Sequence, residues 1–106
     1  MNLIISGKHM EVGDAFRTRI QAKVSSSVAK HFGRPFSGRV ALEKEGSRYT
    51  ADCLVSLDSG AAMKSKGDAH DPQSAFEIAA ERLDKQLRRY GRKIKEHQGA
   101  PQPAWG

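Results

Sequence analysis

Hydrophobic residues recur along the chain with two different spacings, and each change of spacing marks the start of a new predicted element. A short apolar run at residues 3–5 predicts a strand over residues 2–6, which Gly7 is expected to end. The spacing then lengthens, and apolar residues return at every fourth position: Val12, Phe16, Ile20, Val24 and Val28. This repeat predicts an amphipathic helix over about residues 13–31, ended by Gly33 and Pro35.

Between residues 38 and 69 hydrophobic positions alternate with polar ones, which is typical of strands with one buried face. Three strands are predicted, at residues 38–44, 49–57 and 61–69, with turns that contain Gly46 and Gly60. Such short turns connect antiparallel neighbours. The residues expected to share the buried faces of the first two of these strands are Val40, Leu42, Ala51, Cys53, Val55 and Leu57.

The strongest repeat in the chain follows Asp71. Asp71 is expected to accept hydrogen bonds from the first turn of a helix, and Pro72 suits its first position. Apolar residues then recur at spacings of three and four to about residue 96; they are Phe76, Ala79, Ala80, Leu83, Leu87, Tyr90 and Ile94. About 25 helical residues span about 37 Å, whereas a strand of about seven residues spans about 23 Å. We therefore expect this helix to extend beyond the sheet.

The predicted order is strand, helix, three strands and helix. With both helices on one face of an antiparallel sheet, this is an α+β fold, a β-α-β-β-β-α two-layer sandwich with a four-stranded sheet. A chain of 106 residues fits one domain, which we place at residues 1–97. Residues 98–106 are rich in proline and glycine and are predicted to form a flexible tail or the start of a linker.

The charge balance points to a polyanionic partner. The chain has 18 Lys and Arg against 12 Asp and Glu, a net charge of +6, and such an excess favours nucleic acid or an anionic membrane. No apolar run is long enough to cross a bilayer, and the N-terminus does not resemble a secretory signal. The single cysteine, Cys53, is compatible with a reducing compartment. We expect a cytoplasmic protein that does not bind a membrane.

Signals for an enzyme are weak. The four histidines lack metal-ligand spacing, and the chain has no glycine-rich phosphate loop. The best polar cluster, Asp68, His70 and Asp71, is better explained as an exposed strand end followed by a helix cap. We therefore predict no catalytic residue, no metal, no cofactor and no small-molecule substrate.

The basic half of the last predicted helix is the main candidate for binding. Residues 72–97 contain seven Lys and Arg and four acids, but no acid lies between Asp84 and Glu96. A helix that needs only solubility more often mixes its charges. The cations of the first helix are expected to join those of the second in one groove, where they would contact phosphates. The candidate RNA-binding residues are Lys23, Lys30, Arg82, Lys85, Arg88, Arg89, Arg92 and Lys93. Two other interpretations stay open, a merely solvated helix face and a module that binds an acidic protein.

Two segments resemble the ribosome hibernation-promoting factors, the bacterial family that includes the ribosome-associated inhibitor. "LIISGKHMEVGDAFRTRIQAKV" resembles the first strand and helix of that family, and "HDPQSAFEIAAERLDKQLRRYGRKIK" resembles its last helix. The resemblance covers about residues 1–97. Two departures stand out: Pro72-Gln73 replaces a customary Met-Tyr, and Gly91 replaces a better helix former, at a cost of about 1 kcal/mol relative to alanine. If the helix bends or ends early, Gly91 is where we expect it.

The resemblance implies a partner and a site. It implies the β-α-β-β-β-α fold and binding to the small ribosomal subunit and its rRNA, in the channel that messenger and transfer RNA occupy during translation. It also implies that long members carry a second, dimerising domain after a linker. On this basis we expect residues 1–97 to be monomeric in isolation and unable to pair ribosomes unaided.

Overall fold

The computed structural model describes residues 2–33 and 35–99, with side chains as far as Arg92. Within this part the elements are β1 (Asn2–Lys8), α1 (Asp14–His31), β2 (Phe36–Glu45), β3 (Arg48–Leu57), β4 (Ala62–Ala69) and α2 (Pro72–Gly99). This order confirms the predicted β-α-β-β-β-α fold. None of the described helices is long and apolar enough to span a membrane.

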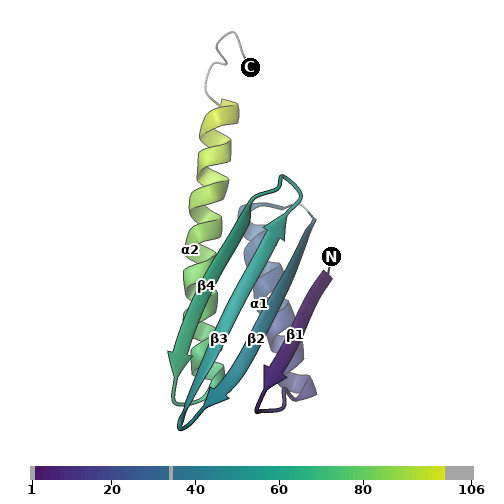
Figure 1. Cartoon of the computed structure of the whole chain (residues 1–106). Coiled ribbons are helices and arrows are strands. Elements are labelled where there is room, and N and C mark those ends of the chain that lie inside the picture. Colours follow the sequence, from purple (N-terminus) through teal and green to yellow (C-terminus); the bar gives the residue numbers. More distant parts are fainter. Residues whose placement is uncertain (1, 34, 100–106) are drawn as a thin grey trace.

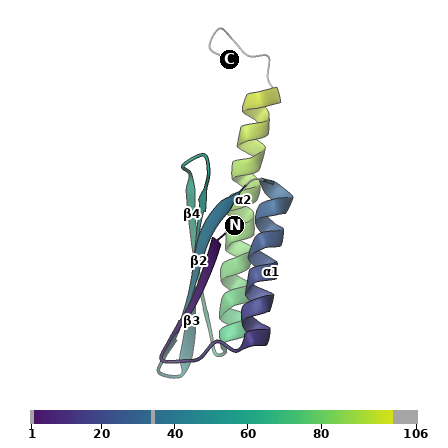
Figure 2. The ribbon, with the colours of Figure 1, turned by 90° about the vertical axis from the view of Figure 1, so that its right-hand side faces the viewer.

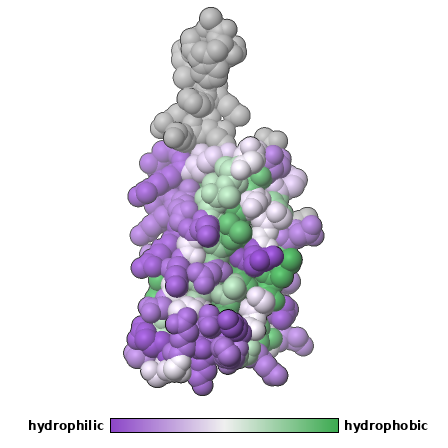
Figure 3. All heavy atoms as spheres, viewed as in Figure 1, coloured by the Kyte–Doolittle hydropathy of each residue, from purple (hydrophilic) through white to green (hydrophobic). Residues whose placement is uncertain are grey.

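The four strands form one sheet in the order β1-β2-β3-β4, and both helices cover the same face of it (Figures 1 and 2). The two-layer arrangement is therefore as predicted. The opposite face carries no helix, and seen from that side hydrophilic residues gather along β4 beside a hydrophobic strip over the middle of the sheet (Figure 3). We call it the open sheet face.

The prediction of a wholly antiparallel sheet is wrong at one edge. β2, β3 and β4 pair antiparallel through tight turns, but β1 runs parallel to β2, with Ile5 opposite Val40. The reason is the connection: α1 crosses over the sheet and returns the chain to the starting end of the next strand, which makes the two strands parallel. β1 also continues through Gly7 to Lys8.

Gly7 serves the turn after β1 and does not end the strand. A β-carbon at position 7 would lie 2.6 Å from the carbonyl oxygen of Met10. Only a residue without a side chain lets the chain fold back so tightly before α1 begins.

The predicted hydrophobic stripes meet in one core between the sheet and the helices. These residues are at most 2% exposed: Ile20, Val24, Val28, Val40, Leu42, Ala51, Cys53, Val55, Phe76, Leu83 and Leu87. Phe16 and Phe76 join the two helices edge to face, with ring centroids 6.1 Å apart. Val12 precedes α1 and, like Tyr90, packs partly buried against the core.

Helix α2 begins where the sequence predicts and ends later. The Ser74 backbone N–H donates to the Asp71 carboxylate at 2.8 Å, and the Ser74 hydroxyl donates to its other oxygen at 2.8 Å. These bonds, the backbone one first, lower the pKa of Asp71. The helix continues past Gly91 to Gly99, so its 28 residues span about 42 Å. It extends well beyond the sheet (Figures 1 and 2).

Candidate nucleic-acid interface

The end of α1 holds α2 at the point where α2 leaves the sheet. The His31 ring nitrogen lies 3.0 Å from the Asp84 carboxylate, and the His31 carbonyl oxygen occupies the space that a β-carbon at Gly91 would need. Gly91 is therefore required by a close helix–helix contact, and α2 does not end there.

Tyr90 adds a second attachment at the same level. Its ring packs against Phe32, with centroids 5.6 Å apart, and its hydroxyl shares a hydrogen bond of 2.5 Å with the Ser59 hydroxyl in the turn between β3 and β4. Where its extended part begins, α2 is thus held at Tyr90 by Phe32, just after α1, and by Ser59, in the turn between β3 and β4.

The groove between the helices has mixed charge. It has a volume of about 370 Å³ and is lined by Lys23, Ser26, Ser27, Lys30, Glu77, Ile78, Ala80, Glu81 and Asp84. The cations of α1 therefore face acids of α2, and the predicted merging of both sets of cations in this groove is wrong. The sequence held a signal for this, because Glu77, Glu81 and Asp84 are spaced by four and three and so share one stripe of a helix.

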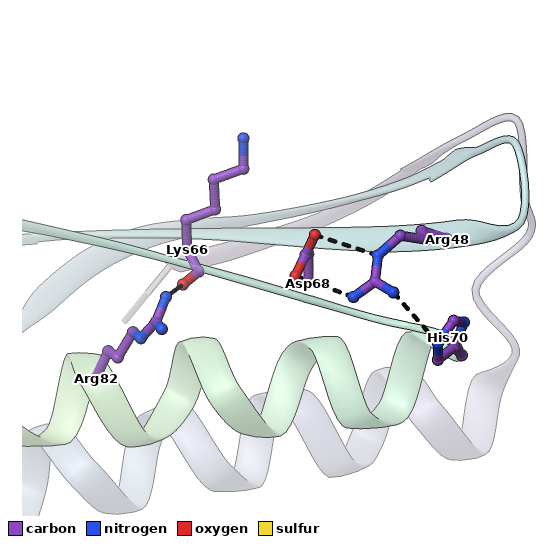
Figure 4. Close-up of polar contacts among 5 residues, drawn as sticks. All are labelled: Arg48, Lys66, Asp68, His70 and Arg82. Carbon is purple, nitrogen blue, oxygen red and sulfur yellow. Dashed lines mark hydrogen bonds and ion pairs between the residues drawn. The ribbon is translucent and has the colours of Figure 1, made fainter.

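Two cations of α2 already have partners in the protein. Arg82 donates to the Lys66 carbonyl at 2.6 Å, which places its guanidinium at the outer edge of β4 (Figure 4). Gln86, one turn later, donates to the Lys64 carbonyl at 2.5 Å. Both bonds satisfy backbone groups of an edge strand that has no further neighbour. Lys85 forms a helical pair with Glu81 at 3.8 Å, and an exposed pair of this kind is weak.

The free positive charge of α2 lies further along the helix. Arg88, Arg89 and Arg92 are exposed, and they form no ion pair with other described residues. Arg88 and Arg92 stand one turn apart, where like charges repel by about 0.2–0.5 kcal/mol. The side chain of Lys93, also a candidate, lies outside the described part of the chain.

Arg48, at the turn between β2 and β3, forms a polar cluster with Asp68 and His70, and the sequence did not predict that Arg48 belongs to it. Arg48 donates to both oxygens of Asp68, at 3.4 and 3.3 Å, and approaches the ring of His70 at 3.3 Å (Figure 4). The interaction joins the ends of neighbouring strands, and Asp71 is used separately as the cap of α2.

Cys53 is buried in the core, as predicted. Burial raises the pKa of its thiol to about 11, so the thiol stays protonated at neutral pH.

Comparison with known proteins shows which family and which proteins the chain is similar to. The family model described as sigma 54 modulation protein / S30EA ribosomal protein matches residues 3–95. The ribosome hibernation promotion factor of Rhizobium meliloti (strain 1021) is 50% identical over 97 residues, which are 92% of this chain and 51% of that protein. The ribosome hibernation promoting factor of Azotobacter vinelandii is 30% identical over 104 residues, 98% of this chain and 95% of that protein.

A solved structure agrees on the fold. The crystal structure of the Thermus thermophilus Protein Y N-terminal domain superposes with a TM-score of 0.77 at 24% identity, over 85% of this chain and 99% of that one. The chain spans about half the length of its Rhizobium and Bradyrhizobium relatives, 51% and 47%. With residues 3–95 matched, the chain belongs to the sigma 54 modulation protein / S30EA ribosomal protein family.

Proposed function

We propose that this protein is a ribosome hibernation factor. It binds rRNA of the small subunit in the channel that messenger and transfer RNA occupy, and it inhibits translation by excluding them. It acts in the cytoplasm as a binding protein without catalysis or cofactor. The names of its relatives support the ribosomal role.

The observation that carries the RNA-binding part is the arginine cluster at the end of α2. Arg88, Arg89 and Arg92 are exposed and unpaired within the described structure. They flank Tyr90, which bonds Ser59 in the turn at the end of the sheet, and beyond this level α2 extends past the sheet (Figure 2). Phosphates would relieve the repulsion among them, because each arginine can donate two hydrogen bonds to one phosphate group.

The other candidate residues add to RNA binding but carry less of it. Lys23 and Lys30 offer two cations on α1, partly offset by the acids of the groove. Arg82 and Lys85 keep free donors beyond the bonds that they make inside the protein. We expect these four residues to contribute less per residue than the arginine cluster.

A cell-free translation assay tests the proposal. Added in several-fold excess over ribosomes, the protein should reduce synthesis and co-sediment with small subunits, and subunits already loaded with messenger and transfer RNA should bind it less. Full synthesis without co-sedimentation would end the proposal. Reduced synthesis without co-sedimentation would favour the alternative, a module that binds an acidic protein.

A further inference from the structure

The open sheet face carries a hollow that the proposed function has not used. Its volume is about 260 Å³, and its lining includes Arg39, Ala41, Asp52, Leu54, Lys64 and Lys66. Arg39 and Lys64 stand in one row on either side of Leu54, and Ala41 and Lys66 stand in the next row on either side of Asp52. Three cations thus surround a small floor made of Ala41, Leu54 and the acid Asp52.

Charge on the rest of this face is largely balanced. At the far end of the sheet Lys8 lies opposite Glu43 in the strand register, and Arg48 pairs with Asp68 at 3.3 Å. Arg39, Lys64 and Lys66 form no ion pair among the described residues. The excess positive charge of the open sheet face is therefore concentrated at the hollow.

The hollow is continuous with the cations of α2 around the edge of β4. The side chain of Lys66 points away from the helices, while its carbonyl group accepts the hydrogen bond from Arg82 on the other side of the strand (Figure 4). Arg89 follows Arg82 after two turns and lies on the same face of α2. A chain of phosphates that crosses this edge would meet cations on both sides.

We infer that the hollow is a second phosphate-binding site, which holds the backbone of an RNA strand that passes around the β4 edge from α2 to the open sheet face. This inference rests on the proposed function. RNA fits better than an acidic protein segment because every nucleotide carries a phosphate, so one strand presents charge without interruption to the cations on both sides of the β4 edge. The described lining contains no aromatic ring on which a base could stack, so the contact is to phosphate and independent of base sequence.

Charge reversal in the hollow tests the inference. Lys64→Glu with Lys66→Glu should lower affinity for purified small subunits on the order of thirtyfold at 0.1 M salt, and should flatten the dependence of log affinity on log salt by about 1.5 to 2. Lys8→Glu with Lys44→Glu gives the same change in net charge elsewhere on the molecule and should leave both quantities near those of the wild type. Asp52→Asn, which removes the acid, should tighten binding severalfold.

A chemical probe identifies the occupant. In a Lys66→Cys variant an iron chelate attaches at position 66, because Cys53 is buried and its thiol stays protonated. The chelate generates hydroxyl radicals, which should cleave rRNA close to position 66. The same probe at position 44 (Lys44→Cys) should give weaker cleavage at other nucleotides.

The outcomes separate the two proposals. If wild-type protein binds subunits but the hollow variant binds equally well and position 66 cleaves no RNA, the hollow is not an RNA site and only the inference fails. If the probe at position 66 cleaves only ribosomal protein, the inference is overturned in favour of an acidic protein segment. If wild-type protein does not bind subunits at all, the proposed function fails first, and the inference falls with it.

Discussion

The carbonyl oxygen of His31, at the end of α1, lies so close to Gly91 of α2 that a β-carbon at position 91 would overlap it. This contact explains a glycine in the middle of a long helix, where it costs about 1 kcal/mol relative to alanine. The lower helix propensity of glycine is offset because α1 can pack closely against α2 at this position. This close packing holds α2 where its extended basic segment begins.

Gly91→Ala should therefore destabilise the fold, although alanine is the better helix former. We expect the free energy of unfolding to fall by about 1–3 kcal/mol, because the new methyl group forces the two helices apart. Urea denaturation measures it. Gly13→Ala is the steric control, since a β-carbon there meets no atom within 4 Å. Because Gly13 is the N-cap of α1, where alanine is less favourable than glycine, the control should lose less than about 1 kcal/mol. A Gly91→Ala protein more stable than the wild type would contradict the contact.

Tyr90 should hold the base of the extended segment through both its ring and its hydroxyl. Tyr90→Phe removes the hydrogen bond to Ser59 and should cost about 0.5–1 kcal/mol, whereas Tyr90→Ala also removes the ring beside Phe32 and should cost about 2 kcal/mol or more. Thermal and urea unfolding of both variants measure these losses.

A double-mutant cycle checks that the hydroxyl acts through Ser59. Ser59→Ala also removes the acceptor of the Ala61 N–H at 3.5 Å. Ser59→Ala combined with Tyr90→Phe should therefore cost about as much as Ser59→Ala alone, because both changes remove the bond between the two hydroxyls. Full additivity of the two losses would show that the bond does not stabilise the fold.

The cap at Asp71 should make stability depend on pH in acid. Because the pKa of Asp71 is lowered in the folded protein, its carboxylate stabilises the fold at neutral pH, and this contribution is lost as the pH falls through the lowered pKa. Asp71→Ala should thus be less stable than the wild type at pH 7, and the difference should shrink in strong acid. Urea titrations at both pH values measure it, with Gln73→Ala as control. An equal difference at both pH values would contradict the capping role.

Much of the fold could be predicted from the sequence, because amphipathic repeats record which face of each element is buried. The repeat from Phe76 to Leu87 marked α2, and the alternation from Val40 to Leu57 marked two strands of the sheet. The parallel pairing of β1 could not be read in this way, since the same apolar run fits either direction of pairing.

Less of the site could be predicted, because it depends on which neighbour each helix face meets. The bond from Arg82 to the edge of β4 and the contact of His31 with Gly91 both join residues far apart in the chain. The acidic stripe of α2 was visible in the sequence, but not that it faces Lys23 and Lys30. Gly91 was correctly singled out as unusual, but its reason lies in α1 and could not be found within its own helix.

The central claim is that the arginine cluster of α2 binds rRNA phosphates. Arg89→Glu with Arg92→Glu leaves the core intact, since both residues are exposed, but it should weaken binding by several kcal/mol. The control, Lys8→Glu with Lys44→Glu, changes net charge equally and should bind like the wild type. Circular dichroism confirms that each variant is folded.

The most direct measurement is the affinity for purified small ribosomal subunits across a salt series, for wild type, double variant and control. With about six phosphates contacted, log affinity should fall against log salt with a slope of about −4 or steeper for the wild type, and the double variant should be flatter by about two. A folded double variant with the affinity and slope of the wild type would contradict the account, because the basic face of α2 would then be only solvated.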